Sequence, residues 1–112
     1  MEIIVVSDTN IFIDLYKVGL LDEFFSLTIH VHTTDLIIHE LKVKEQRSKI
    51  LGYEKLFIKK FNMQEMMELV NFQRKMHDMT NVSIQDCSVW AYAQDNDYTL
   101  LTGDSKLRKI AI

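Results

Sequence analysis

The stretch IIVVSDTNIF, which spans Ile3–Phe12, decides the fold of this chain, because a run of β-branched residues stops at Asp8 and a second apolar run soon begins. Short continuous β-branched runs are typical of strands that are covered on both faces, as in parallel sheets. The apolar residues from Asn10 to Lys17 recur at helical spacing, which predicts a helix directly after the strand. Asp8 therefore stands where a buried strand gives way to a helix.

Strands and helices are expected to alternate along the rest of the chain. The sequence predicts a helix over Leu20–Ser26, a strand over Thr28–His32, a helix from a cap at Thr33 or Thr34 to about Glu45, a helix-rich middle over Lys49–Met79, a helix over Ser83–Gln94, a strand over Tyr98–Thr102 and a helix from Ser105. Such alternation implies parallel strand pairing with helical crossovers. We therefore predict a single α/β domain over residues 1–112, a three-layer α/β/α sandwich with a mainly parallel central sheet.

The composition excludes several classes of protein. Of the 112 residues, 47% are hydrophobic and 26% are charged, which is a globular balance, and no apolar run reaches the length of a membrane span. A single cysteine, Cys87, cannot form an internal disulfide, so we expect a buried thiol in a cytoplasmic protein without a signal peptide. The net charge of −3 argues against binding nucleic acid by bulk positive charge, although a metal ion in an acidic site reverses the local sign.

Two aspartates directly follow predicted strands. Asp8 ends the first strand, and Asp104 comes after the strand that ends at Thr102. Each has an ordinary explanation as a helix N-cap, because a side-chain oxygen there accepts from exposed backbone N–H groups. Parallel strands, however, present their carboxyl ends at one edge of a sheet, where open α/β folds build their sites. We therefore expect the two carboxylates to lie close together.

Two further acids fall on predicted helices. Glu40 lies within an inward-facing stripe, so it is either functional or placed at the edge of the stripe with its carboxylate in water. The other members of the stripe are Leu36, Ile37, Leu41 and Lys44. Asp86 fits a capping box that starts at Ser83, and it also leads a stripe that otherwise faces the core. A charge in the first turn of a buried face is expected at the mouth of a site.

Four acids are thus expected at one site: Asp8, Glu40, Asp86 and Asp104. Two like charges about 4 Å apart cost about 4 kcal/mol at an effective dielectric constant of about 20, so such a cluster takes up protons or binds cations. Ligands that are all oxygen suit Mg²⁺ or Mn²⁺ and not zinc. Metal-bound carboxylates without a protein nucleophile are typical of phosphodiester hydrolysis, in which the metal activates water.

Three segments resemble the PIN-domain ribonucleases, in order and at compatible spacing: VVSDTNIFIDL, TTDLIIHEL and SIQDCSVWAYAQDNDYTLLTGDSKLRK. Among these ribonucleases, the chain resembles the VapC-like toxins of prokaryotic toxin–antitoxin pairs. The resemblance assigns the four acids as catalytic ligands of Mg²⁺ or Mn²⁺, and it places Asn10 and Thr102 beside them. It also implies a PIN-like, Rossmann-like sheet with a C-terminal edge strand, which we expect this chain to lack.

The resemblance further implies the reaction and the partners. Such proteins cut RNA, commonly form homodimers and, as toxins, are inhibited by an antitoxin that inserts a peptide into the acidic cleft. Basic residues follow two of the acids, and they suit phosphate contacts beside the cleft, whereas solvated helix faces are the alternative interpretation. These basic residues are Lys42, Lys44, Lys106 and Arg108.

Two alternatives to a nuclease remain open. The first is a module whose acidic cleft binds a basic partner peptide without catalysis. The second is a phosphatase of the haloacid-dehalogenase type, which would need an aspartate where this chain has Asn10. Elsewhere, Met63, Met66 and Met67 recur at helical spacing, which is typical of a core or of a partner-binding face.

Overall fold

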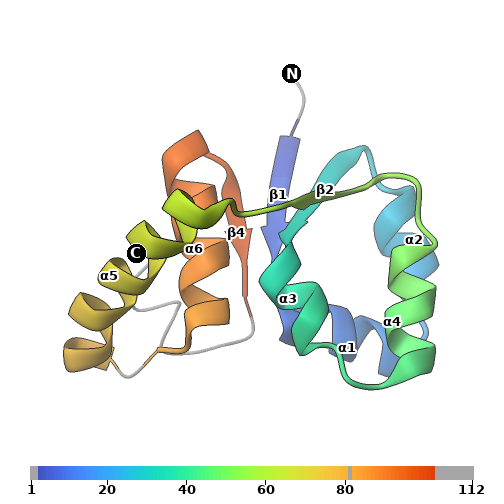
Figure 1. Cartoon of the computed structure of the whole chain (residues 1–112). Coiled ribbons are helices and arrows are strands. Elements are labelled where there is room, and N and C mark those ends of the chain that lie inside the picture. The colour runs from blue at the N-terminus through green and yellow to red at the C-terminus, as the bar shows by residue number, and fades with distance from the viewer. Residues whose placement is uncertain (1–2, 81, 103–112) are drawn as a thin grey trace.

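A parallel sheet runs through the centre of the molecule (Figure 1). The computed structural model describes residues 3–80 and 82–102, and the side chains of all these residues except 76–80. In this part of the chain, the strands pair in parallel in the order β3-β2-β1-β4. They are β1 (Ile3–Ser7), β2 (Ile29–Thr34), β3 (Leu56–Lys59) and β4 (Thr99–Leu101).

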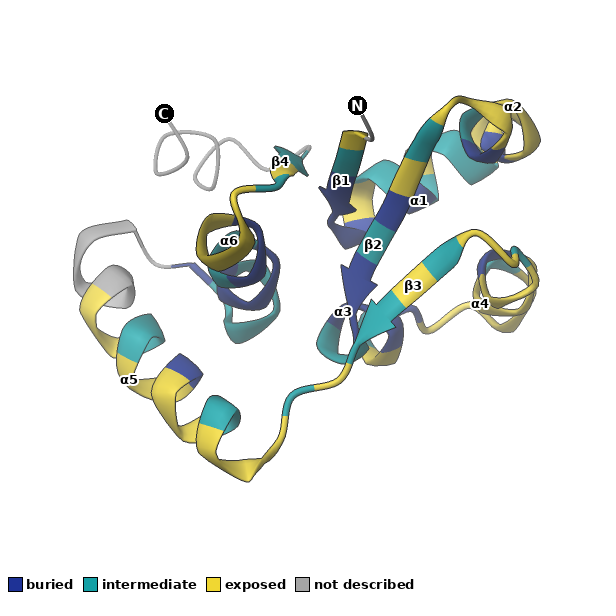
Figure 2. Ribbon diagram, turned by 90° about the horizontal axis from the view of Figure 1, so that it is seen from above, coloured by how far each residue is buried: buried dark blue, intermediate teal, exposed yellow. Residues whose placement is uncertain are grey.

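Helices cover both faces of this sheet. They are α1 (Thr9–Lys17), α2 (Leu21–Ser26), α3 (Asp35–Glu40), α4 (Lys44–Leu51), α5 (Met63–Thr80) and α6 (Ile84–Asn96). Seen from above (Figure 2), α1, α2 and α4 lie on one side of the sheet, and α5 and α6 lie on the other. The strand order explains this division. The chain adds β2 and then β3 on one side of β1, and it then crosses back to add β4 on the other side of β1, so the two groups of crossover helices cover opposite faces. The predicted three-layer α/β/α sandwich is confirmed.

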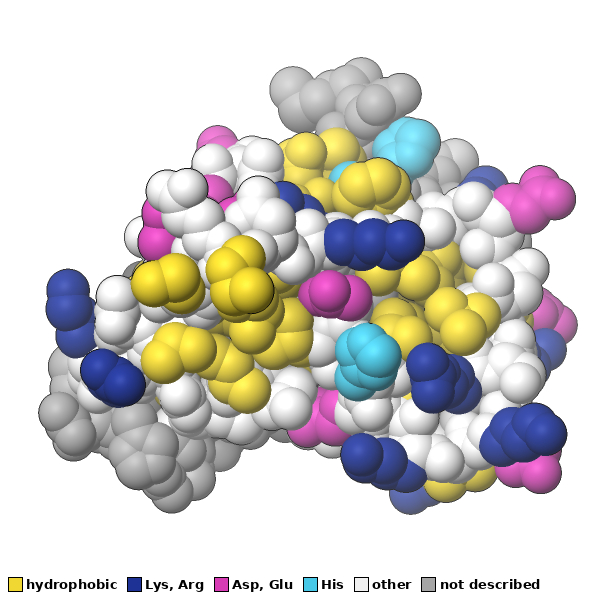
Figure 3. Space-filling model, in the orientation of Figure 1, with side chains coloured by type: hydrophobic (Ala, Val, Ile, Leu, Met, Phe, Trp, Pro, Cys, Tyr) yellow, Lys and Arg dark blue, Asp and Glu magenta, His cyan; other side chains and the backbone are white. Residues whose placement is uncertain are grey.

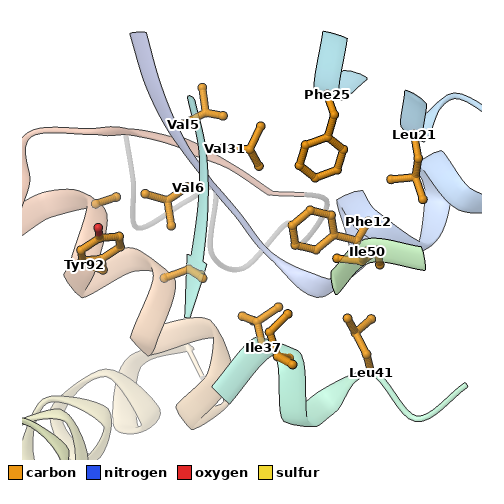
Figure 4. Packing of buried hydrophobic residues seen from close by; sticks show 13 residues of the cluster. Val5, Val6, Phe12, Leu21, Phe25, Val31, Ile37, Leu41, Ile50 and Tyr92 are labelled. Carbon is orange, nitrogen blue, oxygen red and sulfur yellow. The ribbon is translucent and has the colours of Figure 1, made fainter. Parts of the chain in front are cut away.

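The central strands bury side chains on both faces, as their β-branched composition predicts. Val5 and Val31 are paired in register, and they lie on the side of the sheet that holds Phe25 (Figure 4). Val6 points to the opposite side, toward Tyr92 of α6. Because successive side chains of a strand face opposite ways, one apolar run supplies both layers of the core.

Stacked aromatic rings hold the first helices against the sheet. The rings of Phe12 and Phe25 have centroids 6.4 Å apart and planes inclined by 2°, and those of Phe25 and Tyr53 have centroids 4.0 Å apart. Such pairs stabilise a core beyond the burial of their area. Phe12 lies one turn after the start of α1, so its burial holds that start beside the end of β1.

A smaller apolar cluster lies beneath α5. Leu69, Val82 and Cys87 are buried there. Burial, and to a lesser extent the nearby charge of Asp86, raises the pKa of the Cys87 thiol to about 11. The thiol is therefore neutral at physiological pH, and the predicted buried cysteine is confirmed.

The outer surface of α5 exposes apolar side chains (Figure 3). Met63 and Met67 are 79% and 62% exposed, so a core role is wrong for these two residues. Met66 packs partly against the cluster beneath α5. A partner-binding role for this surface stays a prediction. Neither α5 nor any other helix in the described part of the chain is long and apolar enough to cross a membrane.

One predicted helix boundary is wrong. α3 ends at Glu40, and the backbone of Leu41 is extended, with φ −74° and ψ 99°, so the helix does not continue to Glu45. Leu41 is only 2% exposed, because its side chain enters the core while the backbone turns away. Lys44 begins α4 and is exposed, so it does not belong to the stripe of Glu40.

The strand β3 interrupts the middle segment, for which the sequence predicts a helix-rich region. The strand has only four residues, and Phe57 within it is 51% exposed at the edge of the sheet. A short apolar run without a clear period does not distinguish a strand from a helix. Pairing with β2, in which Leu56 lies opposite Val31, is what makes this segment a strand.

Candidate functional site

A cleft opens at the carboxyl edge of the sheet. Its volume is about 310 Å³, and it is lined by Asp8, Thr9, Asn10, Ile13, Glu40, Ser83 and Asp86. Three of the predicted acids therefore face one cleft, although they come from separate elements. Asp8 follows β1, Glu40 ends α3 and Asp86 lies in the first turn of α6.

Hydrogen bonds hold Asp8 at the junction of β1 and α1. The residue is 1% exposed, its Oδ1 accepts the N–H of Ile11 at 3.0 Å, and its Oδ2 accepts the hydroxyl of Thr102. Its own N–H donates to the carbonyl oxygen of Leu101 at 3.2 Å. The predicted N-cap is confirmed, and the capping carboxylate also lines the cleft.

Glu40 reaches the cleft from the last turn of α3. Its side chain is half-buried, and its Oε1 accepts the hydroxyl of Thr9. Thr9 is buried at the start of α1, so this bond joins the end of α3 to the junction beside Asp8. The sequence does not predict Thr9 as a cleft residue. The one sequence feature that could have indicated it is its position between Asp8 and Asn10.

Asp86 enters the cleft from the first turn of α6. Ser83 is the N-cap of this helix, and its Oγ accepts the N–H of Asp86 at 3.1 Å, as the capping pattern predicts. The half-buried side chain of Asp86 lines the cleft together with Ser83. One short segment therefore both starts the helix and presents an acid to the cleft.

Side-chain hydrogen bonds fix α6 relative to β2. The hydroxyl oxygens of Thr34 and Ser88 lie 2.7 Å apart, and the hydroxyl of Tyr92 lies 2.8 Å from Nδ1 of His32. Burial lowers the pKa of His32, so its ring is neutral at physiological pH. These contacts hold the start of α6, and with it Asp86, at the carboxyl end of β2.

The cap at Ser83 makes a testable contribution to stability. Ser83→Ala removes the acceptor for the N–H of Asp86, and we expect the free energy of unfolding to fall by about 1 kcal/mol. Ser83→Asn should retain most of the stability, because asparagine is an equally good N-cap. Urea unfolding followed by circular dichroism measures both variants. An equal loss in the two would contradict the capping role.

The other predicted site residues fall into three groups. Asn10 lines the cleft and Thr102 donates to Asp8, so both lie beside the acids as the resemblance implies. Lys42 and Lys44 are exposed and are not among the residues that line the cleft, so their phosphate contacts stay a prediction. Asp104, Lys106 and Arg108 lie outside the described residues, as does the predicted helix from Ser105. The expected lack of a C-terminal edge strand stays a prediction.

The cleft offers only hard, oxygen-rich donors. Its side chains contribute carboxylates, hydroxyls and one amide, and no histidine or cysteine lines it within the described residues. In residues 3–80 and 82–102, no three His, Cys, Asp or Glu side chains come close enough to form a metal site by themselves. The three acids therefore share the cleft without meeting at one point in this part of the chain.

Comparison with known proteins identifies the family. A family model described as a PIN domain matches residues 4–112, and none of the curated proteins searched matches the chain significantly. PIN domains are generally nucleases. The parallel sheet and the acids at its carboxyl edge agree with this match. Because the match extends over nearly the whole chain, this protein belongs to the PIN-domain family.

Proposed function

We propose that residues 1–112 form one PIN-like domain and that it is a metal-dependent endoribonuclease, which hydrolyses RNA phosphodiester bonds in the cleft at the carboxyl edge of the sheet. One observation carries the proposal: Asp8, Glu40 and Asp86, from three separate elements, line the same cleft. Capping accounts for Asp8 and for the position of Asp86, but it does not require the three carboxylates to face one space. A divalent cation bound in the cleft would account for this shared orientation.

The donor set fits Mg²⁺ or Mn²⁺. Asp8 and Asp86 would hold the ion, with Glu40 completing the acidic side and Asp104, outside the described residues, as the fourth ligand. Mg²⁺ keeps several of its waters and uses one or two carboxylates, so an open set of acids suits it better than a closed cage would. When bound, the ion supplies an activated water and stabilises the charge on the phosphate.

Neighbouring residues would keep these acids in position. Thr9 donates to Glu40 and Thr102 donates to Asp8, so each carboxylate has one oxygen oriented by a hydroxyl from another element. Such bonds limit the directions in which the remaining lone pairs point. The amide of Asn10 lines the same cleft and would hydrogen-bond to the ion's waters or to the substrate. We propose that four cations contact RNA phosphates: Lys42 and Lys44, which are exposed, and Lys106 and Arg108, which lie outside the described residues.

Metal removal is the direct test. On a mixed panel of RNA substrates, we expect cleavage with Mg²⁺ or Mn²⁺, its loss with EDTA and its return when the metal is restored in excess. Asp86→Asn should abolish cleavage, whereas Asp97→Asn, the same substitution at the exposed C-cap of α6, should not. Cleavage that persists in EDTA, or in Asp86→Asn, would overturn the proposal.

The biological setting is proposed from the resemblance to VapC-like toxins. We propose a cytoplasmic toxin that forms a homodimer and is inhibited by an antitoxin whose peptide enters the acidic cleft. Affinity purification of the tagged chain from its own host should then recover a small protein with a basic tail. If that partner is recovered and no RNA is cut although metal binding is measurable, the alternative of a peptide-binding module replaces the nuclease.

A further inference from the structure

A second pocket lies between α5 and α6, and it shares no lining residue with the acidic cleft. Both helices lie side by side on the same face of the sheet (Figures 1 and 2). The volume of the pocket is about 220 Å³. Pockets for drug-sized ligands hold about 300–1,000 Å³, so this one suits a single side chain or a group of that size.

Aromatic side chains form the walls of this pocket. Phe72 of α5 and Trp90 of α6 both line it, and their rings stack with centroids 4.9 Å apart and planes inclined by 22°. Phe61, from the segment between β3 and α5, lines it as well, and Leu69, which is 3% exposed, closes the apolar side. Three aromatic rings therefore line the pocket.

Acidic side chains form the rim. Glu65, Glu68 and Asp95 all line the pocket. The negative charge of Glu65 is paired within the chain, because Nζ of Lys59 lies 2.7 Å from its Oε2. This hydrogen bond lowers the pKa of Glu65. Glu68 and Asp95 form no ion pair within the described residues. Among the described residues, the rim thus has two negative charges without an ion-pair partner beside aromatic walls.

The chain itself shows which chemistry this combination attracts. The ammonium group of Lys59, besides pairing with Glu65, lies 5.6 Å from the centroid of the Phe61 ring. One cation of the protein therefore already uses one carboxylate and one ring of this pocket. Glu68, Asp95 and the stacked pair of Phe72 with Trp90 offer a second, similar set to a cation from outside.

We propose that this pocket binds an arginine side chain presented by a peptide segment of a partner protein. A guanidinium group is planar, so it stacks on aromatic faces while its fork of N–H donors reaches carboxylates at the rim. A lysine ammonium would satisfy the charge but not the stacking. Nucleic acid is disfavoured because its phosphates would meet Glu68 and Asp95. The site is independent of the proposed cleavage reaction.

Trp90 makes the proposal directly testable, because it is the only tryptophan of the chain and lines the pocket. The probes are the peptide acetyl-Ala-Arg-Ala-amide and its citrulline counterpart, which has the same shape without the charge. Titration of the full chain to about 10 mM peptide allows for the modest affinity of a single side chain. We expect a saturable change in tryptophan emission with the arginine peptide and binding at least about tenfold weaker with citrulline.

Matched variants locate the binding. Asp95→Asn should weaken the arginine peptide severalfold, whereas Asp97→Asn removes the same charge two residues further on, outside the pocket, and should leave the affinity unchanged. Both residues are exposed, so neither change threatens the fold. The proposal fails if the arginine peptide leaves the emission unchanged, if the citrulline peptide binds equally well, or if the two variants weaken binding equally.

Discussion

We expect Asp8→Asn to lower RNA cleavage at least about a hundredfold, the loss typical of removing one preorganised charge at a reacting centre. The substitution removes a negative charge from the cleft and changes little else. Asparagine keeps an oxygen for the N–H of Ile11, because it is as good an N-cap as aspartate. The hydroxyl of Thr102 can turn to accept from the new amide. Initial rates on a cleaved RNA in excess Mg²⁺ measure the effect.

Two controls separate lost chemistry from lost folding. Urea unfolding of Asp8→Asn should give a free energy within about 1 kcal/mol of the parent protein, since the cap is retained. Asp97→Asn should cleave at the parental rate, because this residue is exposed at φ 58°, a conformation that asparagine tolerates. A folded Asp8→Asn variant that cuts RNA at the parental rate would remove Asp8 from the reaction.

Phe12→Ala should lower the free energy of unfolding by about 3–5 kcal/mol, which is a large part of the stability of a small domain. Phe12 is 0% exposed, and its ring packs between α1 and the sheet beside Phe25 (Figure 4). Alanine would lose the transfer free energy of the ring and leave a cavity that a close-packed interior fills only in part. Urea unfolding monitored by circular dichroism measures the change.

A graded series keeps this prediction informative if Phe12→Ala does not fold. Phe12→Leu retains most of the buried volume, so it should fold with a smaller loss than alanine would cause. Phe57→Ala removes the same ring from a position that is 51% exposed, and it should cost much less than Phe12→Ala. If Phe12→Leu and Phe57→Ala lowered the free energy of unfolding by similar amounts, the core between α1 and the sheet would tolerate a smaller side chain at position 12.

Much of the fold could be predicted because its signals are local. Two such signals, the β-branched run of β1 and the capping residues Asp8 and Ser83, depend on neighbouring residues alone. The parallel arrangement followed from the alternation of strands and helices, since parallel strands need crossovers. The same reasoning predicted Asp8 at the carboxyl edge of the sheet, whereas Glu40 and Asp86 were predicted from their places on helices.

Other features depend on contacts between distant segments. β3 is a strand because β2 pairs with it, and α3 stops at Glu40 because the core takes up the side chain of Leu41. Thr9 was missed because its partner, Glu40, is distant along the chain, and no periodicity links two such positions.

The amino-acid pattern alone therefore accounts for the alternation of most strands and helices, for the layering and for the acid at the end of β1, since hydrophobic periodicity and caps act over a few residues. Only the packing of β1, α3 and α6 decided which residues share a cleft. The same packing decided which carboxylate accepts each hydroxyl. The same packing created the aromatic pocket with its acidic rim, whose walls come from α5 and α6. Side chains on separate helices meet only through the long-range packing of a close-packed core.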